Sequence, residues 1–304
     1  MYTLLTGSSG FIGRNLHEYL ISVGRKVIAP DENQLDLTDF QDVKNYFDSY
    51  NISKIVHSAT ALRNKTDYSD DVCEVNLRLF FNLLENADPN CKIINFGSGS
   101  EYSRAHWQPE MDEVYFGANI PEDSHSLAKY VISKYIDGIK SNRITTFRIF
   151  GIFGKYEDYK FKFISNSIAK ALVGLPIVIN RDAIYDYVYI DDFCKLIDAS
   201  LEKSFNYTSY NITSAEPSSL SSIAKIIIKH VNSSIELRIL QDGIGVHYTG
   251  KNNRLSELVP EFKFHNIESS IKDLIVYYKA NIDQVDRASL ELDEYINYAK
   301  KINS

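Results

Sequence analysis

The first 150 residues alternate short apolar runs with longer stretches in which apolar residues recur every three or four positions. The runs predict strands before Gly7 and at 26–29, 54–59, 92–96 and 145–150, and the periodic stretches predict helices between them, including 72–87 and 125–140. Strands that alternate with helices of this length predict an α/β fold with a doubly wound parallel sheet. Ligands bind such sheets at the carboxyl ends of the strands.

The pattern changes after Gly151. Aromatic and basic loops precede a predicted helix at about 165–173 and a strand near 176–179, and a further helix starts after 188–193. We therefore expect a dinucleotide-binding domain at 1–150, with 186–213 returning to it. A smaller C-terminal substrate-binding region would comprise 151–185 and 214–304.

The first strand runs into a glycine-rich turn, Thr6-Gly7-Ser8-Ser9-Gly10-Phe11-Ile12-Gly13, which is followed at once by helical spacing. Such a turn lets the backbone approach a diphosphate, and the start of the helix offers unpaired N–H groups to it. A strand, glycine turn and helix in this order predict a Rossmann-like dinucleotide site. A simple surface loop is the alternative.

Three later segments extend this predicted site. Asp31 follows the second strand, where a carboxylate can bind the ribose of a dinucleotide. Asp36 and Leu37 could contact an adenine edge, unless Thr38 or Asp39 only caps the next helix. The strand at 54–59 closes in the small residues Ser58 and Ala59, as suits a backbone packed against a cofactor.

Composition narrows the classes of partner. The chain of 304 residues carries a net charge of −7 and shows no cluster of Lys and Arg, which argues against nucleic-acid binding. Its three cysteines have no metal-ligand spacing, and no apolar run approaches the length of a membrane helix, so we expect no metal site and no membrane contact. A start without a signal-peptide pattern predicts a cytoplasmic location.

Taken together, these motifs resemble those of the extended short-chain dehydrogenase/reductase family, which comprises nucleotide-sugar epimerases, dehydratases and reductases. The resemblance rests on the glycine turn, on Asp31, on the serine turn at Ser98 and on the segment 185–192, Tyr-Asp-Tyr-Val-Tyr-Ile-Asp-Asp. It implies a nicotinamide cofactor, a nucleotide-diphosphate sugar as substrate and hydride transfer at a sugar carbon. It also implies a homodimer that pairs helices 72–87 and 125–140, although those apolar faces could simply cover the sheet.

The family uses a Ser, a Tyr and a Lys four residues after the Tyr. Ser98 matches the serine and Lys129 the lysine, but His125 stands at the tyrosine position. The pair Tyr130 and Lys134 offers a competing register five residues further along the helix, so only one of the two pairs can face the cofactor. The resemblance favours His125, because the tyrosine of the family lies in the first helical turn after a proline-containing loop, here 121–124.

A neutral imidazole beside a lysine ammonium would accept a proton more readily than donate one. The His ring, alone or through a water, could therefore carry out acid–base chemistry, or Tyr102 or Tyr115 could substitute for it. Ser100 is the remaining candidate in the serine turn.

Departures from related enzymes narrow the reaction. Dehydratases of this family carry an Asp-Glu pair in the serine turn, where this chain has Ser100 and Glu101, and GDP-fucose synthases carry a Cys where Ser100 stands. Reduction of a 4-keto sugar is therefore the favoured prediction. A 4-epimerase is one alternative, and a catalytically weak NAD(P)-binding sensor, which the missing tyrosine would suit, is another.

Cofactor and substrate contacts complete the predicted site. Asp31 favours NAD by repelling the 2′-phosphate of NADP, whereas Arg14 could bind that phosphate. Beside Tyr102, the candidates for contact with the nucleotide diphosphate are Lys162, Asn166, Arg181 and Arg254, and the alternative for each cation is an exposed surface charge.

Overall fold

A computed structural model describes residues 1–61, 63–64 and 67–302. The chain divides into two compact units. The first comprises 1–150, 193–212 and 250–262, and the second comprises 151–192, 213–249 and the remainder from 263.

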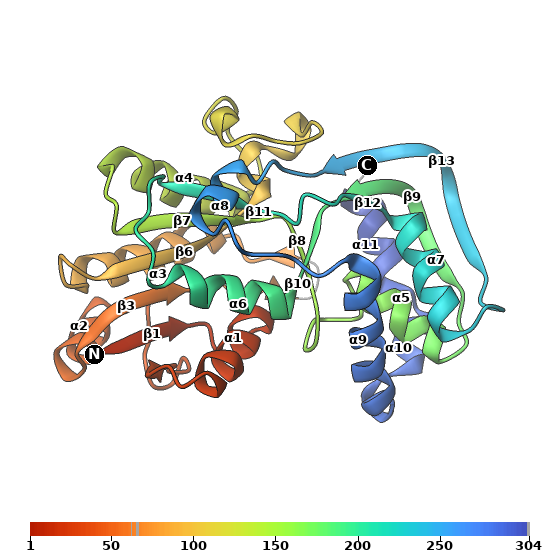
Figure 1. Ribbon diagram of the computed structural model, residues 1–304, viewed down its shortest axis with the longest axis horizontal. Helices are drawn as coiled ribbons and strands as arrows, with labels where there is room; N and C mark the ends of the chain where they lie inside the picture. Colours follow the sequence, from red (N-terminus) through yellow and green to blue (C-terminus); the bar gives the residue numbers. More distant parts are fainter. Residues whose placement is uncertain (62, 65–66, 303–304) are drawn as a thin grey trace. The chain divides into compact units, whose positions relative to one another are not determined.

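A six-stranded parallel sheet forms the centre of the first unit (Figure 1). Its strand order is β11-β7-β6-β3-β1-β2, and each neighbouring pair is parallel. The bounds are β1 Tyr2–Thr6, β2 Val27–Ile28, β3 Ile52–His57, β6 Lys92–Ser98, β7 Ile144–Ile149 and β11 Ser209–Ile212. This sheet confirms the predicted doubly wound α/β fold.

Helices cover both faces of this sheet because successive strand residues point to opposite sides. Ile93 belongs to the core beneath α2, α3 and α4, whereas the ring of Phe96 points to the other face and lies 5.1 Å from Phe193 of α6. Arg25, just after α1, ion-pairs with Asp198 of α6 at 2.6 Å. The helices are α1 Phe11–Ser22, α2 Phe40–Ser49, α3 Val72–Asn86, α4 Ser124–Ile139, α6 Ile190–Ser200 and α8 Asn253–Leu258.

Short elements connect the main ones. A two-stranded hairpin, β4 Arg63–Asn64 and β5 Asp67–Tyr68, precedes α3. Three 3-10 turns follow β6, namely η1 Gly99–Tyr102, η2 Arg104–His106 and η3 Glu113–Tyr115.

The second unit has its own three-stranded sheet, in the order β12-β9-β13. Strand β9 is antiparallel to β12 and parallel to β13. A separate parallel pair joins β8 to β10. The bounds are β8 Gly151–Phe153, β9 Ile177–Tyr185, β10 Tyr187–Tyr189, β12 Ser218–Ser219 and β13 Leu237–Tyr248.

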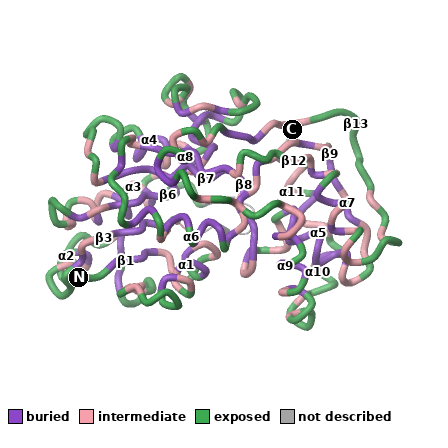
Figure 2. Tube along the Cα trace, in the orientation of Figure 1, coloured by how far each residue is buried: buried purple, intermediate pink, exposed green. Residues whose placement is uncertain are grey.

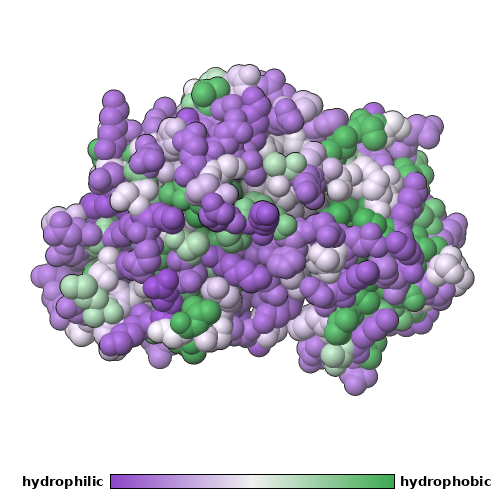
Figure 3. All heavy atoms as spheres, viewed as in Figure 1, coloured by the Kyte–Doolittle hydropathy of each residue, from purple (hydrophilic) through white to green (hydrophobic). Residues whose placement is uncertain are grey.

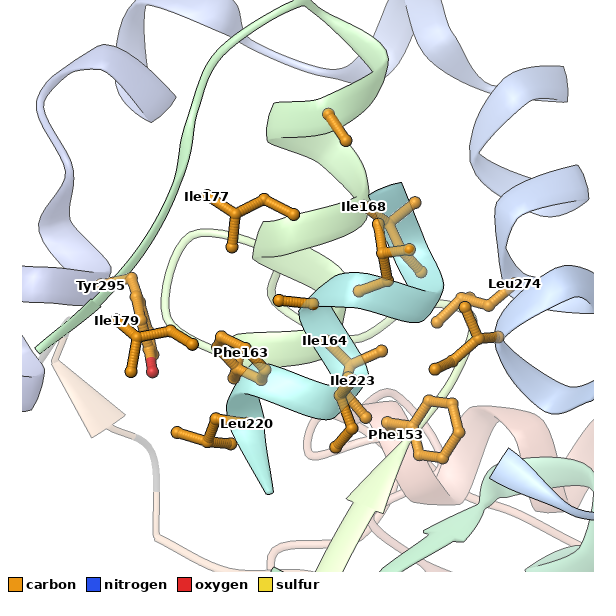
Figure 4. Close-up of a cluster of buried hydrophobic side chains, with 14 of the residues drawn as sticks. Phe153, Phe163, Ile164, Ile168, Ile177, Ile179, Leu220, Ile223, Leu274 and Tyr295 are labelled. Carbon is orange, nitrogen blue, oxygen red and sulfur yellow. The ribbon is translucent and has the colours of Figure 1, made fainter. Parts of the chain in front are cut away.

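Helices of the second unit pack on β9 around a core of aliphatic and aromatic side chains (Figure 4). Ile177 and Ile179 of β9 meet Ile164 and Ile168 of α5 and Ile223 of α7 there. The helices are α5 Phe163–Leu172, α7 Leu220–Val231, α9 Ile267–Ala280, α10 Arg287–Glu291 and α11 Glu294–Ile302, with the 3-10 turn η4 Ile282–Gln284.

The observed units differ from the predicted domains at two segments and at Thr213, which lies in the second unit. Residues 186–192 lie in the second unit because β10 pairs with β8 and because Asp186 accepts hydrogen bonds from Ser214. Residues 250–262 lie in the first unit, where α8 packs beside β11. Among the described residues, none of the helices has the length and apolar character needed to cross a bilayer.

Candidate functional site

Two glycines of the first turn are required by the packing of the chain itself. Gly7 has φ +70°, and a Cβ atom there would lie 2.7 Å from the amide nitrogen of Ala59. A Cβ atom on Gly13 would lie 2.0 Å from the carbonyl oxygen of Gly7. Any side chain at these two positions would force the backbone of the turn apart.

Gly10 is different, because no described residue requires a glycine there. Its φ of −80° and ψ of 171° suit any residue, and among the described atoms a Cβ atom would meet only the Gly7 carbonyl, at an ordinary 3.5 Å. Gly10 is also the N-cap of α1, and its own residue type offers no side chain to cap the first N–H groups of the helix. A glycine and a helix N-terminus placed in this way fit the approach of an anionic group such as a pyrophosphate.

Other predicted cofactor residues lie around this turn. Phe11 and Ile12 are half-buried in the first turn of α1. Arg14 is exposed and ion-pairs with Glu18 at 3.4 Å. Asp31 is exposed just after β2, and its Oδ1 accepts hydrogen bonds from the backbone N–H groups of the turn that follows it.

The pair Asp36 and Leu37 serves the local structure. Asp36 Oδ1 accepts hydrogen bonds from the backbone and side chain of Thr38, and the side-chain bond chiefly lowers the pKa of that carboxyl. Leu37 is buried, and Asp39 caps α2 by accepting from the backbone of Gln41. The predicted capping role is thus confirmed for Asp39, and contact of Asp36 or Leu37 with adenine stays a prediction.

A buried hydrogen-bond cluster joins the ends of β1 and β3. Thr6 Oγ1 accepts from the amides of Ser58 and Ala59, each at 3.2 Å, and lies 2.9 Å from Nδ1 of His57. Burial, reinforced by the charge of Lys129, lowers the pKa of His57 to about 3. Our sequence reasoning assigned no role to Thr6 or His57, although both lie at carboxyl ends of strands.

Lys129 of α4 reaches the carboxyl end of β6. Its Nζ donates a hydrogen bond to the carbonyl oxygen of Phe96 at 2.7 Å, and it is close enough to His57 to affect its titration. Burial lowers the pKa of Lys129, which the charge of Glu101 partly opposes. The ammonium group is therefore held where parallel sheets of this type bind their ligands.

His125 is the second residue of α4 and lies one helical turn before Lys129. The N-cap Asp123 accepts a hydrogen bond from the backbone of Ser126 at 2.9 Å. The competing pair, Tyr130 and Lys134, packs against Phe116, which lies outside β6. The Tyr130 ring lies 5.2 Å from the Phe116 ring, and Lys134 Nζ lies 5.5 Å over that same ring. Of the two lysines, only Lys129 bonds to the end of β6.

The serine turn follows β6 directly. Ser98 Oγ accepts hydrogen bonds from the backbone N–H of Ser100 at 3.1 Å and from its hydroxyl at 3.0 Å. Ser98 is half-buried and Ser100 is buried. The indole N–H of Trp107 donates to the carbonyl of Gly99 at 3.2 Å and so holds the turn from its other side.

A buried ion pair beneath the serine turn escaped the sequence reasoning. Glu101 Oε1 accepts from the amide of Ser98 at 2.9 Å, and its Oε2 lies 2.7 Å from Nε of Arg148. The side chains of Glu101 and Arg148 are 0% and 1% exposed. The guanidinium also stacks 3.8 Å over the Phe116 ring and donates to the hydroxyl of Ser209. The only sequence signal for this pair was an acidic residue in the turn directly after a predicted strand.

Tyr102, predicted to contact substrate, is instead part of the core. It is 2% exposed, its hydroxyl donates to Asn211 at 2.8 Å, and burial raises its pKa to about 12. This location removes Tyr102 from the groups that we propose to contact substrate. Tyr115, the other predicted substitute for the tyrosine, is 46% exposed at the end of η3.

The predicted substrate cations fall into both units. Arg254 lies on α8 of the first unit, not in the predicted C-terminal region. Its Nη1 donates to the Ser209 carbonyl at 3.4 Å, and its guanidinium lies 4.6 Å over the Tyr207 ring. In the second unit Lys162 and Arg181 are exposed. Asn166 is buried there and donates to the carbonyl of Tyr159 at 2.9 Å.

Two curated proteins are similar in sequence to most of this chain. A UDP-glucuronate 4-epimerase of Thermodesulfobacterium geofontis is 25% identical over 329 aligned residues, which cover 93% of this chain and 98% of that protein. A dTDP-4-dehydro-6-deoxyglucose reductase of Escherichia coli is 25% identical over 287 residues, covering 81% of this chain and 87% of the reductase.

A solved UDP-glucose 4-epimerase of Thermotoga maritima, with UDP-glucose, superimposes with a TM-score of 0.79 at 18% identity, over 93% of this chain and 100% of that one. The model of the NAD dependent epimerase/dehydratase family matches residues 3–213, more than half of the sequence. The chain therefore belongs to the NAD dependent epimerase/dehydratase family.

Proposed function

We propose that this protein transfers a hydride between a nicotinamide dinucleotide and carbon 4 of a nucleotide-diphosphate sugar, as a reductase of a 4-keto sugar. The observation that carries the proposal is the position of Lys129, which is bonded to the end of β6 one helical turn from His125. The relatives support carbon 4, because one is named a 4-epimerase and another a reductase of a 4-dehydro sugar.

The cofactor would bind along the carboxyl ends of β1, β2, β3 and β6. Gly10 and the N-terminus of α1 would receive its pyrophosphate, Asp31 its adenosine ribose and Lys129 its nicotinamide ribose. The bound nicotinamide supplies or accepts the hydride. The proposed set is Gly7, Gly10, Phe11, Ile12, Gly13, Arg14, Asp31, Asp36, Leu37, Ser58, Ala59 and Lys129.

His125 would exchange a proton with the sugar oxygen at carbon 4. A general acid–base group must lie within hydrogen-bond reach of that oxygen or reach it through one water, and an imidazole is shorter than a phenol. Ser98 would donate a hydrogen bond from its hydroxyl to the same oxygen, and Ser100 would orient that hydroxyl by donating to Ser98 Oγ. In the direction of reduction, the imidazole would donate its proton to the oxygen that becomes an alkoxide at carbon 4, and it would then take up a proton from solvent.

Elimination of water is disfavoured by the state of Glu101. Both of its carboxylate oxygens are occupied inside the protein, one by the amide of Ser98 and the other by Arg148, and the side chain is fully buried. A carboxylate held in this way cannot take a proton from a sugar carbon. This argues against a dehydratase.

A 4-epimerase is the second candidate, because the T. geofontis relative of that name covers nearly the whole chain. An epimerase would use the same hydride-transfer groups twice, with rotation of the sugar between the two steps. Arg254 of the first unit is a proposed contact of the diphosphate, and Lys162, Arg181 and Asn166 of the second unit are candidates for the same role. A homodimer through α3 and α4 remains a proposal that the family resemblance suggests.

The test is turnover by the purified protein with NADH or NADPH and a panel of UDP-, dTDP-, GDP- and ADP-linked 4-keto sugars. Net oxidation of the nicotinamide would indicate a reductase. Interconversion of 4-epimers by NMR without net oxidation would indicate an epimerase. Tight dinucleotide binding with neither reaction would contradict the proposal and favour a sensor.

Substitution of each lysine in turn tests which of the two belongs to the active site. Lys129→Met should lower kcat/KM by about 10²-fold or more, because it removes the charge that orients the cofactor and adjusts acid–base chemistry. The matched control is Lys134→Met on the same helix, which should stay within a few-fold of the wild type. Equal losses in the two variants would show that the register is wrong.

A further inference from the structure

Strand β13 forms an open edge of the second unit's sheet. It pairs with β9 along one side, and no other strand of the described chain pairs with its second side. Figure 1 shows β13 as the outermost strand of this sheet, and Figure 2 shows most of its length exposed. An edge of this length presents a row of backbone groups that can join another strand.

The register with β9 identifies which backbone groups face outward. The amide of Ile177 bonds to the carbonyl of Glu236, so Glu236 faces β9. In a parallel ladder alternate residues face the neighbouring strand, so 238 and 240 also face β9. Leu237, Ile239 and Gln241 therefore direct their N–H and C=O groups away from the sheet.

This part of the edge is also apolar. Ile239 lies beside Ile179 of the buried face of the sheet, yet it is 46% exposed, and Leu240 on the opposite face is 49% exposed. Hydrophobic residues reach the surface at several places on the face shown in Figure 3, and the exposed fractions of Ile239 and Leu240 identify this edge as one apolar site. One further strand would cover Ile239 and so extend the buried face.

We propose that this strand is β13 of a second copy of the chain, paired antiparallel about a two-fold axis through Leu240. In this register Leu240 faces Leu240 of the second copy. Ile239 faces the second copy's Gln241, and these two outward-facing residues exchange backbone hydrogen bonds. Arg238, which also ion-pairs with Glu236 of its own strand at 2.5 Å, faces the second copy's Asp242 on the same side as Leu240. Each interface therefore contains two opposite-charge pairs between the copies.

The charges select this register over its neighbours. Moving the strands by one step in either direction would place Leu240 opposite Asp242 or Arg238 opposite Leu240. A break in the ladder between Gln241 and Ile244, with Gly243 at φ +81°, ends the regular stretch. Pairing is thus confined to about six residues, and Arg238 and Asp242 disfavour a strand that lacks the complementary charges.

A cysteine variant tests the register directly. Leu240→Cys places two cysteines opposite each other at a non-hydrogen-bonded pair, so mild oxidation should crosslink most of the protein into a dimer. The matched control is Ile244→Cys, which is equally exposed, at 47% in the wild type, on the same strand. In the proposed register the two copies of residue 244 lie about 26 Å apart, so this variant should not crosslink.

Charge exchange tests the same interface without a crosslink. Arg238→Asp and Asp242→Arg should each lower the yield of the Leu240→Cys crosslink several-fold, and the double exchange should restore it. In analytical ultracentrifugation Leu240→Lys should halve the mass of the assembly, with or without another interface through α3 and α4. Absence of the Leu240→Cys crosslink, equal crosslinking at residue 244, or binding of β13 to a different protein instead would overturn the proposal.

Discussion

Glu157 is a buried carboxyl in the second unit that carries no part of the proposed chemistry. It is 7% exposed and accepts a hydrogen bond from the hydroxyl of Ser165 at 2.5 Å. Burial raises its pKa to about 7, which is above the value of 4.5 for an exposed glutamate. The folded state therefore binds a proton at this site over a pH range in which the unfolded chain has lost it.

This shift predicts how stability depends on pH. Because the pKa of Glu157 is raised in the folded state, the carboxyl does not lower the free energy of unfolding below about pH 4.5. It lowers that free energy progressively as the pH rises to about 7. Between those two pH values, the free energy of unfolding of Glu157→Gln should therefore rise by about 3 kcal/mol relative to that of the wild type. Urea unfolding at several pH values measures this difference. A parallel pH dependence in wild type and variant would contradict it, and the exposed Glu291→Gln should match the wild type.

The Glu101–Arg148 pair predicts a larger effect of a single substitution. Arg148→Met leaves the Glu101 carboxylate buried without its cation, so unfolding should become easier by about 3–5 kcal/mol. The double variant Glu101→Gln/Arg148→Met should lose less than the sum of the two single losses. Chemical denaturation measures all three variants. The exposed Arg287→Met control, which breaks an ion pair with Glu291, should lose less than about 1 kcal/mol.

At the scale of the elements, two glycines of the turn between β1 and α1 have different predicted roles, one in folding and the other in cofactor binding. Gly13→Ala brings a methyl group to 2.0 Å from the Gly7 carbonyl, so it should destabilise the first unit strongly. Gly10→Ala meets no such clash and should cost less than about 1 kcal/mol of stability. It should nevertheless weaken NADH binding at least tenfold, because its methyl group would lie where the pyrophosphate approaches.

Isothermal titration with NADH and thermal unfolding of the same samples measure these two effects. Gly138→Ala is a suitable control for loss of an exposed glycine, because a Cβ atom there meets no described atom within 4 Å and the backbone of α4 is not left-handed at this position. If Gly10→Ala binds NADH as tightly as the wild type, the proposed pyrophosphate position is wrong.

At the scale of the whole molecule, a nicotinamide dinucleotide should stabilise the fold. A ligand that binds only the folded state adds about 2.7 kcal/mol at a concentration one hundred times its Kd. We expect NADH to raise the unfolding midpoint more than NADPH does, because Asp31 repels a 2′-phosphate. Asp31→Asn should narrow that difference. A larger shift with NADPH in the wild type would show instead that Arg14 governs the choice of cofactor.

Much of this architecture was predictable from local patterns. The apolar runs and the helical spacing located the parallel strands and α3, α4 and α5 to within a few residues, because each of these segments buries one face or one stripe. Strand β9 extends beyond its predicted end near 179 to Tyr185, since its later residues pair with β12 and β13. The sequence shows hydrophobic periodicity, but it does not show which distant strand lies alongside.

The sequence by itself determined the α/β class, the glycine turn and the His125–Lys129 spacing, since each depends on residues close together in the chain. Only the tertiary structure decided that Lys129 rather than Lys134 reaches the end of β6, that Tyr102 is buried against Asn211, and that Glu101 pairs with Arg148. It also assigned Arg254 to the first unit. These features depend on contacts between residues far apart in sequence, where burial and hydrogen bonding are set by the packing of the sheet and not by any local pattern.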